Sequence, residues 1–406
     1  MRKTGKADAR QYFFNLNVLN GALLQLNASD IISQAFLNLT SAKNFEFYPS
    51  IVGRQKIGEF GFGGSILQEQ TCNWNSSDVS LDGKEVEACP MSIMVEICQW
   101  DVERSFIANQ LALGKSFTEP VPADLQAVVT QKIKEKLQEE LELITWKGDD
   151  DLDSNVYGHL ALCDGLEKKI NTNVNEGEIP ASQILASTTV TSSNVIDTLT
   201  SAYNAIPTKL KTNKADLKMF VSQNIADAYL IATATQSNEI YFLADRPLNF
   251  LGIEMVVAGG ASDNTLVISR KINYALLTDM LSFEPSFNIV NMTATTNEPK
   301  MRFRSDLKFG VDTLNDNEFV VMMDNLKPTL SAISPTSGAV GAVVTLTGTN
   351  LGATTKVMFG TIEGTDVTVV NGTTVTAKVP TGATGTVAVK AVTPAGETGT
   401  KNFTVS

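Results

Sequence analysis

The chain has 406 residues, enough for two or three domains with sizeable cores, and a formal net charge of −12. Its hydrophobic content of 43% is ordinary for a globular protein, and no apolar run reaches the length of about 18 residues that a membrane span needs. The acidity argues against a protein that follows the phosphates of nucleic acid, because such proteins carry a basic surface.

The first predicted element is an N-terminal arm over residues 1–52. Short apolar stretches follow polar residues there, as in Asn17–Leu26 and Asp30–Leu39, which indicates short helices. The extreme N-terminus is basic but has neither the apolar stretch nor the cleavage site of a secretory signal. We therefore expect a protein that is made in the cytosol and does not leave by the secretory route.

A glycine-rich segment at residues 53–88 is predicted to form a long hairpin or projecting loop. Two extended flanks meet at a polar tip around Asn73–Ser77, and the flanks contain Gly53, Gly58, Gly61, Gly63, Gly64 and Gly83. Such a loop buries little of itself, so we expect it to lie on a neighbouring molecule. The next stretch, Cys89–Trp100, is predicted to be a strand.

A long amphipathic helix is predicted at residues 123–146. Pro122 suits the first turn of a helix, and Gly148 suits its C-terminal end. One face carries an apolar stripe at three- to four-residue spacing, formed by Leu125, Val129, Ile133, Leu137, Leu141 and Ile144. At 1.5 Å per residue, this helix would be about 36 Å long.

The following segment, residues 155–290, alternates helical and strand patterns. Helices are predicted at Asn194–Ile206 and Ile225–Thr235, with a strand at Leu217–Asn224 between them. Further strands are expected in Phe250–Gly260 and Asn264–Met280. Residues 298–324 are expected to return as a pair of strands, followed by an exposed connector near Asn325–Pro328, where the proline disfavours a continuing helix or central strand.

This order of elements resembles the major capsid proteins of tailed bacteriophages, which have the Hong Kong 97 fold shared with encapsulin shells and the herpesvirus capsid floor. The resemblance covers roughly residues 30–326. The stretches that carry it are Glu140–Asp151, Lys214–Leu230, Pro247–Gly259, Asn264–Met280 and Arg302–Met322. The resemblance implies an α+β fold and a subunit that assembles with copies of itself into hexamers and pentamers around double-stranded DNA.

The same resemblance implies a division of the chain into named parts. These are an N-terminal arm (1–52), an extended E-loop (53–88), a peripheral domain (89–154 and 291–326) that contains the spine helix 123–146, and an axial domain (155–290). Some members of the family begin with a cleaved scaffolding segment, whereas here the arm starts almost at Met1. We expect either that any scaffold or protease is a separate chain, or that the sequence is a mature product that happens to begin with Met. Some members also crosslink lysine to asparagine. Lys56 and Lys84 lie in the loop, but nothing in the sequence identifies a partner asparagine.

The last 80 residues, 327–406, differ in composition from the rest of the chain. They contain 20 Thr, 11 Gly and only two aromatic residues, and their five Lys exceed their three acids. Short alternating runs such as Thr374–Val379 and Thr386–Ala391 are separated by turn signals at Asn371-Gly372, Pro380–Gly382 and Pro394–Gly396. This pattern predicts an all-β sandwich of about seven strands.

The segment Ile333–Leu351 ("ISPTSGAVGAVVTLTGTNL") and the runs after it resemble an immunoglobulin-like domain of the plexin and transcription-factor type. No Cys or Trp lies within these residues, so the Cys…Trp…Cys pattern of antibody domains is missing. The family serves in adhesion, in carbohydrate-associated enzymes and on virions. The resemblance therefore implies a fold and leaves open whether the domain binds a ligand or serves as a spacer.

The sequence gives little support for catalysis, and we expect no enzyme, no catalytic residue, no cofactor and no metal site. His159 is the single histidine, and Gly114-Lys115-Ser116 lacks the upstream glycine of a phosphate-binding loop. Aligning Asp151, Asp153 and Asn155 as calcium ligands puts Val156 at the glycine position and Leu162 at the bidentate glutamate position. We expect a solvated turn there. The four cysteines, Cys72, Cys89, Cys98 and Cys163, are expected to be buried thiols in a reducing compartment.

The leading hypothesis is therefore a major capsid protein of the virion, assembled in the bacterial host cytoplasm, with an outward Ig-like domain that contacts host-surface glycans. Expected partners are copies of the same chain, a portal, and a scaffold or decoration protein, with no membrane and no sequence-specific contact to DNA. Two alternatives remain open at this point. One is another virion protein, such as a tail tube or baseplate subunit, and the other is a surface carbohydrate-binding adhesin.

Overall fold

The structure, a computed structural model, describes residues 39–49, 51, 53–62, 67, 79–98, 123–236, 248–279, 288–292, 296, 298 and 300–406. The chain forms two compact units. The first comprises Met1–Leu39, Phe47–Glu139 and Leu277–Gly310, and the second comprises Thr40–Glu46, Glu140–Leu276 and Val311–Ser406. Most of the predicted N-terminal arm lies outside the described residues. The fold is α+β, as expected from the sequence.

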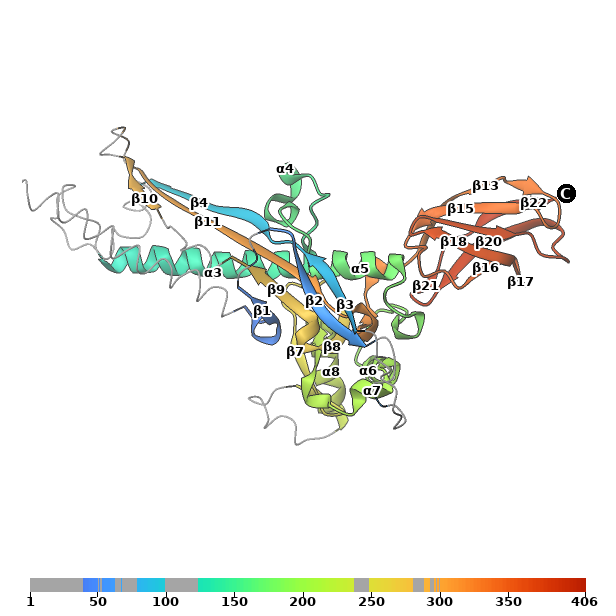
Figure 1. Ribbon diagram of the computed structural model, residues 1–406, viewed down its shortest axis with the longest axis horizontal. Coiled ribbons are helices and arrows are strands. Elements are labelled where there is room, and N and C mark those ends of the chain that lie inside the picture. Colours follow the sequence, from blue (N-terminus) through green and yellow to red (C-terminus); the bar gives the residue numbers. More distant parts are fainter. Residues whose placement is uncertain are drawn as a thin grey trace, which may run out of the picture. The chain divides into compact units, whose positions relative to one another are not determined.

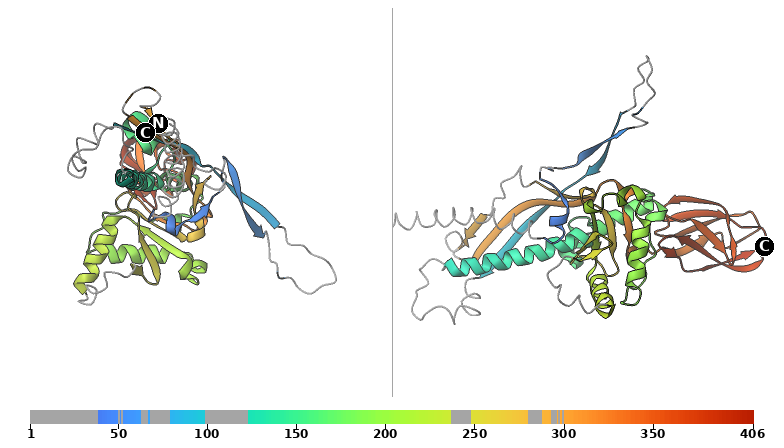
Figure 2. Two further views of the ribbon diagram at one scale, coloured as in Figure 1. Left: turned by 90° about the vertical axis from the view of Figure 1, so that its left-hand side faces the viewer. Right: turned by 90° about the horizontal axis from the view of Figure 1, so that it is seen from below.

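In the first unit, the predicted hairpin is present as two antiparallel strands. β2 (Gln55–Phe62) pairs with β3 (Val79–Val86) from Gln55↔Val86 to Phe62↔Val79, and they form a two-stranded sheet of their own (Figure 2). At the base of the hairpin, Arg54 Nε lies 2.7 Å from Glu87 Oε2, so the two chain ends meet there. The polar tip that we predicted lies outside the described residues.

A long strand organises the rest of the first unit's sheet. β11 (Lys300–Thr313) pairs antiparallel with β4 (Cys89–Cys98) and with β10 (Asn288–Asn291), while β1 (Glu46–Tyr48) and β9 (Tyr274–Thr278) complete the sheet. The expectation that residues 298–324 form a strand pair is wrong. β12 (Val320–Met322) pairs with β8 in a different sheet, because the two segments find separate partners far away in the sequence.

The predicted long helix is α3 (Ala123–Lys147), one residue longer than expected at its C-terminal end (Figure 1). Its exposed side chains form i,i+3 ion pairs, Lys132–Glu135 at 2.6 Å and Lys136–Glu139 at 3.0 Å. Exposed pairs of this kind contribute little to stability, because solvent screens their charges. Stability comes instead from the apolar stripe, whose last members, Leu141 and Ile144, are buried.

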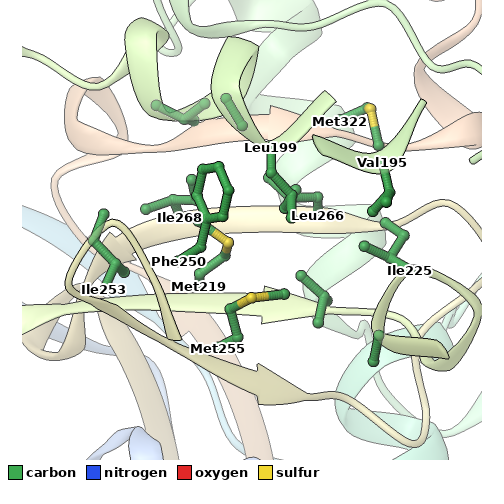
Figure 3. Close-up of a cluster of buried hydrophobic side chains, with 14 of the residues drawn as sticks. Val195, Leu199, Met219, Ile225, Phe250, Ile253, Met255, Leu266, Ile268 and Met322 are labelled. Atoms are coloured by element: carbon green, nitrogen blue, oxygen red, sulfur yellow. The ribbon is translucent and has the colours of Figure 1, made fainter. Parts of the chain in front are cut away.

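The second unit contains a five-stranded sheet in the order β12-β8-β5-β7-β6. Its strands are β5 (Leu217–Val221), β6 (Asn249–Phe250), β7 (Ile253–Val257), β8 (Leu266–Arg270) and β12. β5 is parallel to β7 and antiparallel to β8. The α6 and α8 helices, Val195–Ala205 and Gln223–Gln236, were both predicted, and they pack on this sheet. The shared core includes Leu199, Met219 and Ile268 (Figure 3).

Short helices fill the remaining connections of the second unit. The α-helices are α4 (Ser154–Tyr157), α5 (Leu166–Glu176) and α7 (Thr208–Lys211). The 3-10 helices are η1 (Ala42–Asn44), η3 (Gly158–Ala161), η4 (Ala181–Gln183), η5 (Lys214–Asp216), η7 (Lys271–Asn273), η8 (Asp316–Glu318) and η9 (Asp324–Leu326).

The C-terminal residues form the predicted sandwich of two sheets, which are antiparallel except for the parallel β14–β22 pair (Figure 1). One has the order β13-β15-β19-β18, with strands Thr329–Ser334, Val343–Thr349, Thr374–Lys378 and Thr365–Asn371. The other has the order β14-β22-β20-β16-β17, with strands Ser337–Gly338, Lys401–Val405, Gly385–Thr393, Lys356–Phe359 and Ile362–Glu363, and β21 (Gly396–Glu397) pairs with β20. The enclosed core contains both aromatic residues, Phe359 and Phe403.

The connector to the sandwich is not the exposed segment that we predicted. η9 begins it, and Leu326 is only 2% exposed, while Pro328 is also buried. Only Asn325 and Lys327 are exposed. The expectation fails because proline at 328 limits which secondary structure can follow but says nothing about burial against the rest of the unit.

Candidate functional site

The C-terminal end of α3 leads into a compact turn that returns to the start of α5. Gly165 N donates to Gly148 O at 2.8 Å, and Asp149 N donates to Leu160 O at 2.8 Å, which closes the loop between them. A side chain at position 148 would not fit, since its Cβ would lie 2.2 Å from Cys163 O. Gly148 is therefore required for two reasons: it suits the end of the helix, as predicted, and it allows this close approach of the backbone at Cys163.

The acidic turn is organised around one lysine on α5. Lys168 Nζ lies 2.6 Å from Asp149, 2.7 Å from Asp150, 2.8 Å from Asp151 and 2.9 Å from Asp164. Carboxylate oxygens of Asp149, Asp150 and Asp151 lie within 4.8 Å of one another, the kind of convergence that can hold a cation. The ammonium group of Lys168 takes that position.

The ion pairs of this cluster shift the pKa values of Lys168 and Asp150. Burial alone would lower the pKa of Lys168, but its hydrogen bonds to the four carboxylates outweigh burial and hold the pKa well above its usual range. The hydrogen bond from Lys168 in turn lowers the pKa of Asp150. Lys168 stays protonated at neutral pH, so it can act neither as a nucleophile nor as a general base.

A cavity of about 530 Å³ lies beside this cluster, lined by residues of α3, α5, the β7–β8 loop and η9, including Trp146, Lys168 and Asn325. Glu167 is its buried acid. Its carboxylate accepts from Ser262 N at 2.6 Å, from Ser262 Oγ at 2.8 Å and from Thr265 Oγ1 at 3.2 Å. Burial raises the pKa of Glu167 against these hydrogen bonds. Because protein donors already engage both of its oxygens, Glu167 holds the β7–β8 loop to α5.

A second buried network ties the segment before η1 to the end of α3. Trp146 Nε1 donates to Ser41 Oγ at 2.8 Å, and Ser41 Oγ donates to Glu142 Oε1. Trp146 is fully buried, and its ring centroid lies 5.5 Å from that of Phe220. Phe220 also packs edge-on against Phe45 and Tyr274. These contacts are structural. They hold Ser41 and Phe45 against the end of α3 and against Phe220.

The residues that we considered for chemistry are not brought together. His159 lies half-buried in η3, and its Nε2 has no hydrogen-bond partner. Gly114-Lys115-Ser116 lies outside the described residues. The acidic run is a turn, as expected, but it is centred on Lys168, which the sequence analysis did not single out. The i,i+4 spacing of Asp164 and Lys168 was the available signal.

The expectation of buried thiols is wrong for the three cysteines that the structure describes. Cys89 and Cys163 are disulfide-bonded, and Cys98 is a free, partly exposed thiol. Cys72 lies outside the described residues. A disulfide joins cysteines that the fold brings together, and sequence spacing alone does not reveal such proximity.

The variant Lys168→Met is expected to lose about 2 kcal/mol of stability at pH 7, because it leaves the partly buried carboxylates without a compensating positive charge. The loss stays moderate because solvent screens the more exposed carboxylates. The raised pKa of Lys168 keeps its contribution complete below the unfolded lysine pKa, so that contribution is present at pH 7. Protonation of Asp150, whose pKa the hydrogen bond from Lys168 lowers, should shrink the difference only below the ordinary aspartate pKa of about 4. Thermal melting across pH measures this.

Calcium provides a second readout for that variant. With the ammonium removed, the three converging carboxylates should bind Ca²⁺ at about millimolar concentration and restore part of the lost stability. Lys132→Met, which removes one exposed i,i+3 pair on α3, is the matched control and should change melting little. If Lys168→Met melts like Lys132→Met, the cluster does not stabilise the turn.

Comparisons with known proteins find a family match for the C-terminal residues and similar solved structures for most of the chain. Residues 328–406 match the IPT/TIG domain family. A TIG/IPT Ig-like domain sits at the C-terminus. No curated protein matches the chain. Within the described residues, the helices are too short or too polar to cross a membrane.

Among solved structures, phage capsid proteins are similar to this chain. One belongs to the procapsid of satellite phage P4, with 11% identity and a TM-score of 0.45 over 71% of this chain and 98% of that one. Another forms the capsid of an empty GTA particle, with 12% identity and a TM-score of 0.46 over 70% and 88%. A chain from Mycobacterium phage Che8 has 14% identity and a TM-score of 0.38 over 70% and 89%.

Proposed function

We propose that this protein is the major capsid protein of a tailed phage, a structural subunit without catalysis that assembles into an icosahedral shell around double-stranded DNA. The order of elements carries the proposal. A hairpin (β2–β3) is followed by a strand paired to a long late strand (β4–β11), then by a helix of 25 residues (α3), and then by an α/β sheet domain. The sequence resemblance implies this same order.

Each of these elements is proposed to have its own role in the shell. Residues 1–52 serve as an arm, residues 53–88 as an extended loop over a neighbour, residues 89–154 and 291–326 as the peripheral domain, and residues 155–290 as the axial domain. Hexamers and pentamers form by mass action over many interfaces, with a portal and a separate scaffold or decoration protein as further partners. The strong net acidity, −12 overall, suits a wall that encloses DNA without adhering to it.

The Ig-like domain is proposed to face outward and to make weak, repeated contacts with host-surface glycans. Both of its aromatic rings are in the core, with Phe359 1% and Phe403 0% exposed, so stacking on sugar rings is not available to it. Contact would instead use the hydroxyl and amide groups that cover its surface, such as Thr347, Thr349 and Asn371. Single contacts of that kind are weak, and affinity would come from the number of copies.

Electron microscopy of purified particles tests the shell, and a chain that ends at Leu326 tests the appendage. Both chains should give closed icosahedral shells with equal DNA content, while the shorter one should be retained less on a glycan-coated surface. Tubes in place of shells would favour a tail-tube subunit, and monomers would favour an adhesin. Equal retention of both particles would reject the glycan role but leave the capsid role standing.

A further inference from the structure

The last turn of α5 contacts the Ig-like domain through Asn175. Its Nδ2 donates to Asn350 Oδ1 at 3.2 Å, and its Oδ1 accepts from Gly352 N at 3.3 Å. The same Nδ2 donates within α5 to the main-chain and side-chain oxygens of Asn171, at 3.0 and 2.6 Å. Asn175 is thus oriented by its own helix for the contact that it makes with the sandwich.

The connector joins the same network through one carbonyl group. Asn325 O accepts from Asn171 Nδ2 at 2.8 Å and from Asn350 Nδ2 at 2.6 Å. Asn350 has φ 56°, a left-handed conformation that asparagine tolerates better than most residues, and it also donates to Lys327 O at 3.1 Å. Helix, connector and sandwich therefore meet at four residues, which we call the asparagine clamp: Asn171, Asn175, Asn325 and Asn350.

Two glycines of the sandwich allow this close approach. A Cβ at Gly352 would lie 2.0 Å from Asn175 O, and a Cβ at Gly372 would lie 2.9 Å from Asn175 Cβ. The first contact is with the backbone of Asn175 and the second with its side chain, and both are closer than real Cβ atoms come, so neither glycine accepts a side chain while the contact exists. Main-chain hydrogen bonding brings the two glycines together, since Leu351 N donates to Gly372 O at 2.8 Å.

We propose that the asparagine clamp fixes the Ig-like domain to α5 in a single orientation, so that the domain is a rigid extension of the α/β body. Figure 1 shows the end of α5 beside the sandwich. The buried connector supports this, because a flexible tether would be exposed and rich in Gly and Ser, whereas Leu326 is 2% exposed. Every copy would then present the same face of the domain. The inference concerns the single chain, and it stands or falls independently of shell assembly and glycan binding.

Limited proteolysis with chymotrypsin tests the clamp in the full chain. Cleavage after the buried Leu326 requires the connector to open, so its rate reports the population of the released state. Gly352→Ala forces the new Cβ against Asn175, and Asn175→Ala removes the two hydrogen bonds between the Asn175 side chain and the sandwich without changing the sandwich. Both are expected to accelerate cleavage after Leu326 at least tenfold, with mass spectrometry identifying the released fragment 327–406.

Gly399→Ala is the matched control, because it makes the same substitution in the same domain where a Cβ meets nothing within 4 Å. It should be cleaved at the wild-type rate. The separate melting transition of the sandwich should persist in all three variants, since its core is its own. The proposal is overturned if Asn175→Ala and Gly352→Ala are cleaved as slowly as wild type, or if Gly399→Ala is accelerated equally.

Discussion

Excising the β2–β3 hairpin is expected to abolish shell assembly while leaving the subunit folded. Among the described residues, β2 and β3 pair only with each other, and an isolated two-stranded hairpin is at best marginally stable in water. It therefore needs a surface to lie on, and in the proposed shell a neighbouring subunit supplies that surface. Removing it would take away one contact from every subunit at once, so the effect on assembly should be all or none.

The structure makes this excision feasible. Arg54 and Glu87 flank the hairpin and form an ion pair at 2.7 Å, so a short Gly-Ser link can replace residues 55–86 without stretching the chain. Circular dichroism and melting should show an intact body, and electron microscopy should show no particles. The matched control is the chain that ends at Leu326, which loses more residues and should still assemble. Normal shells from the excised chain would remove the hairpin from the proposed mechanism.

Local sequence patterns predicted those helices and strands whose buried residues recur at one regular spacing along the chain. The stripe that ends in Leu141 and Ile144 identified α3, and the apolar run at Leu217–Val221 identified β5, because a helix or a central strand must bury one continuous set of side chains. The sandwich was predictable for the same reason, since the inward residues Val375 and Ala377 alternate with outward threonines.

Features that depend on residues far apart in the sequence were not predictable. β12 joins β8 and not β11, and nothing in the sequence of Val320–Met322 specifies that partner. The acidic turn looked solvated because its lysine, Lys168, lies beyond two further short helices. The docked connector was missed because asparagines are common in exposed turns, and only the fold shows that Asn175 and Asn350 face each other.

The second large effect is expected for Trp146→Ala, at the end of α3. Trp146 is 0% exposed, and its loss would leave a cavity among Phe220, Gly260 and the Ser41–Glu142 pair. Removing a fully buried large aromatic side chain costs about 3–5 kcal/mol, part of it from the cavity. For a unit of this size, that corresponds to a fall of roughly 8–15 °C in the melting temperature of the body.

Part of the stability lost in Trp146→Ala comes from a hydrogen bond, and a milder substitution measures that part separately. Trp146→Phe keeps much of the ring but removes the N–H that donates to Ser41 Oγ, so it should cost less, with about 1 kcal/mol from the lost hydrogen bond. Ser41→Ala should cost more than that bond alone, because it leaves both Trp146 Nε1 and the buried Glu142 without this partner. Differential scanning calorimetry resolves the body from the sandwich, whose transition should stay constant in all three variants. If Trp146→Ala melts within about 2 °C of wild type, too small a shift for such a cavity, then the end of α3 does not anchor residues 40–46, and the arm is not fixed where it leaves the body.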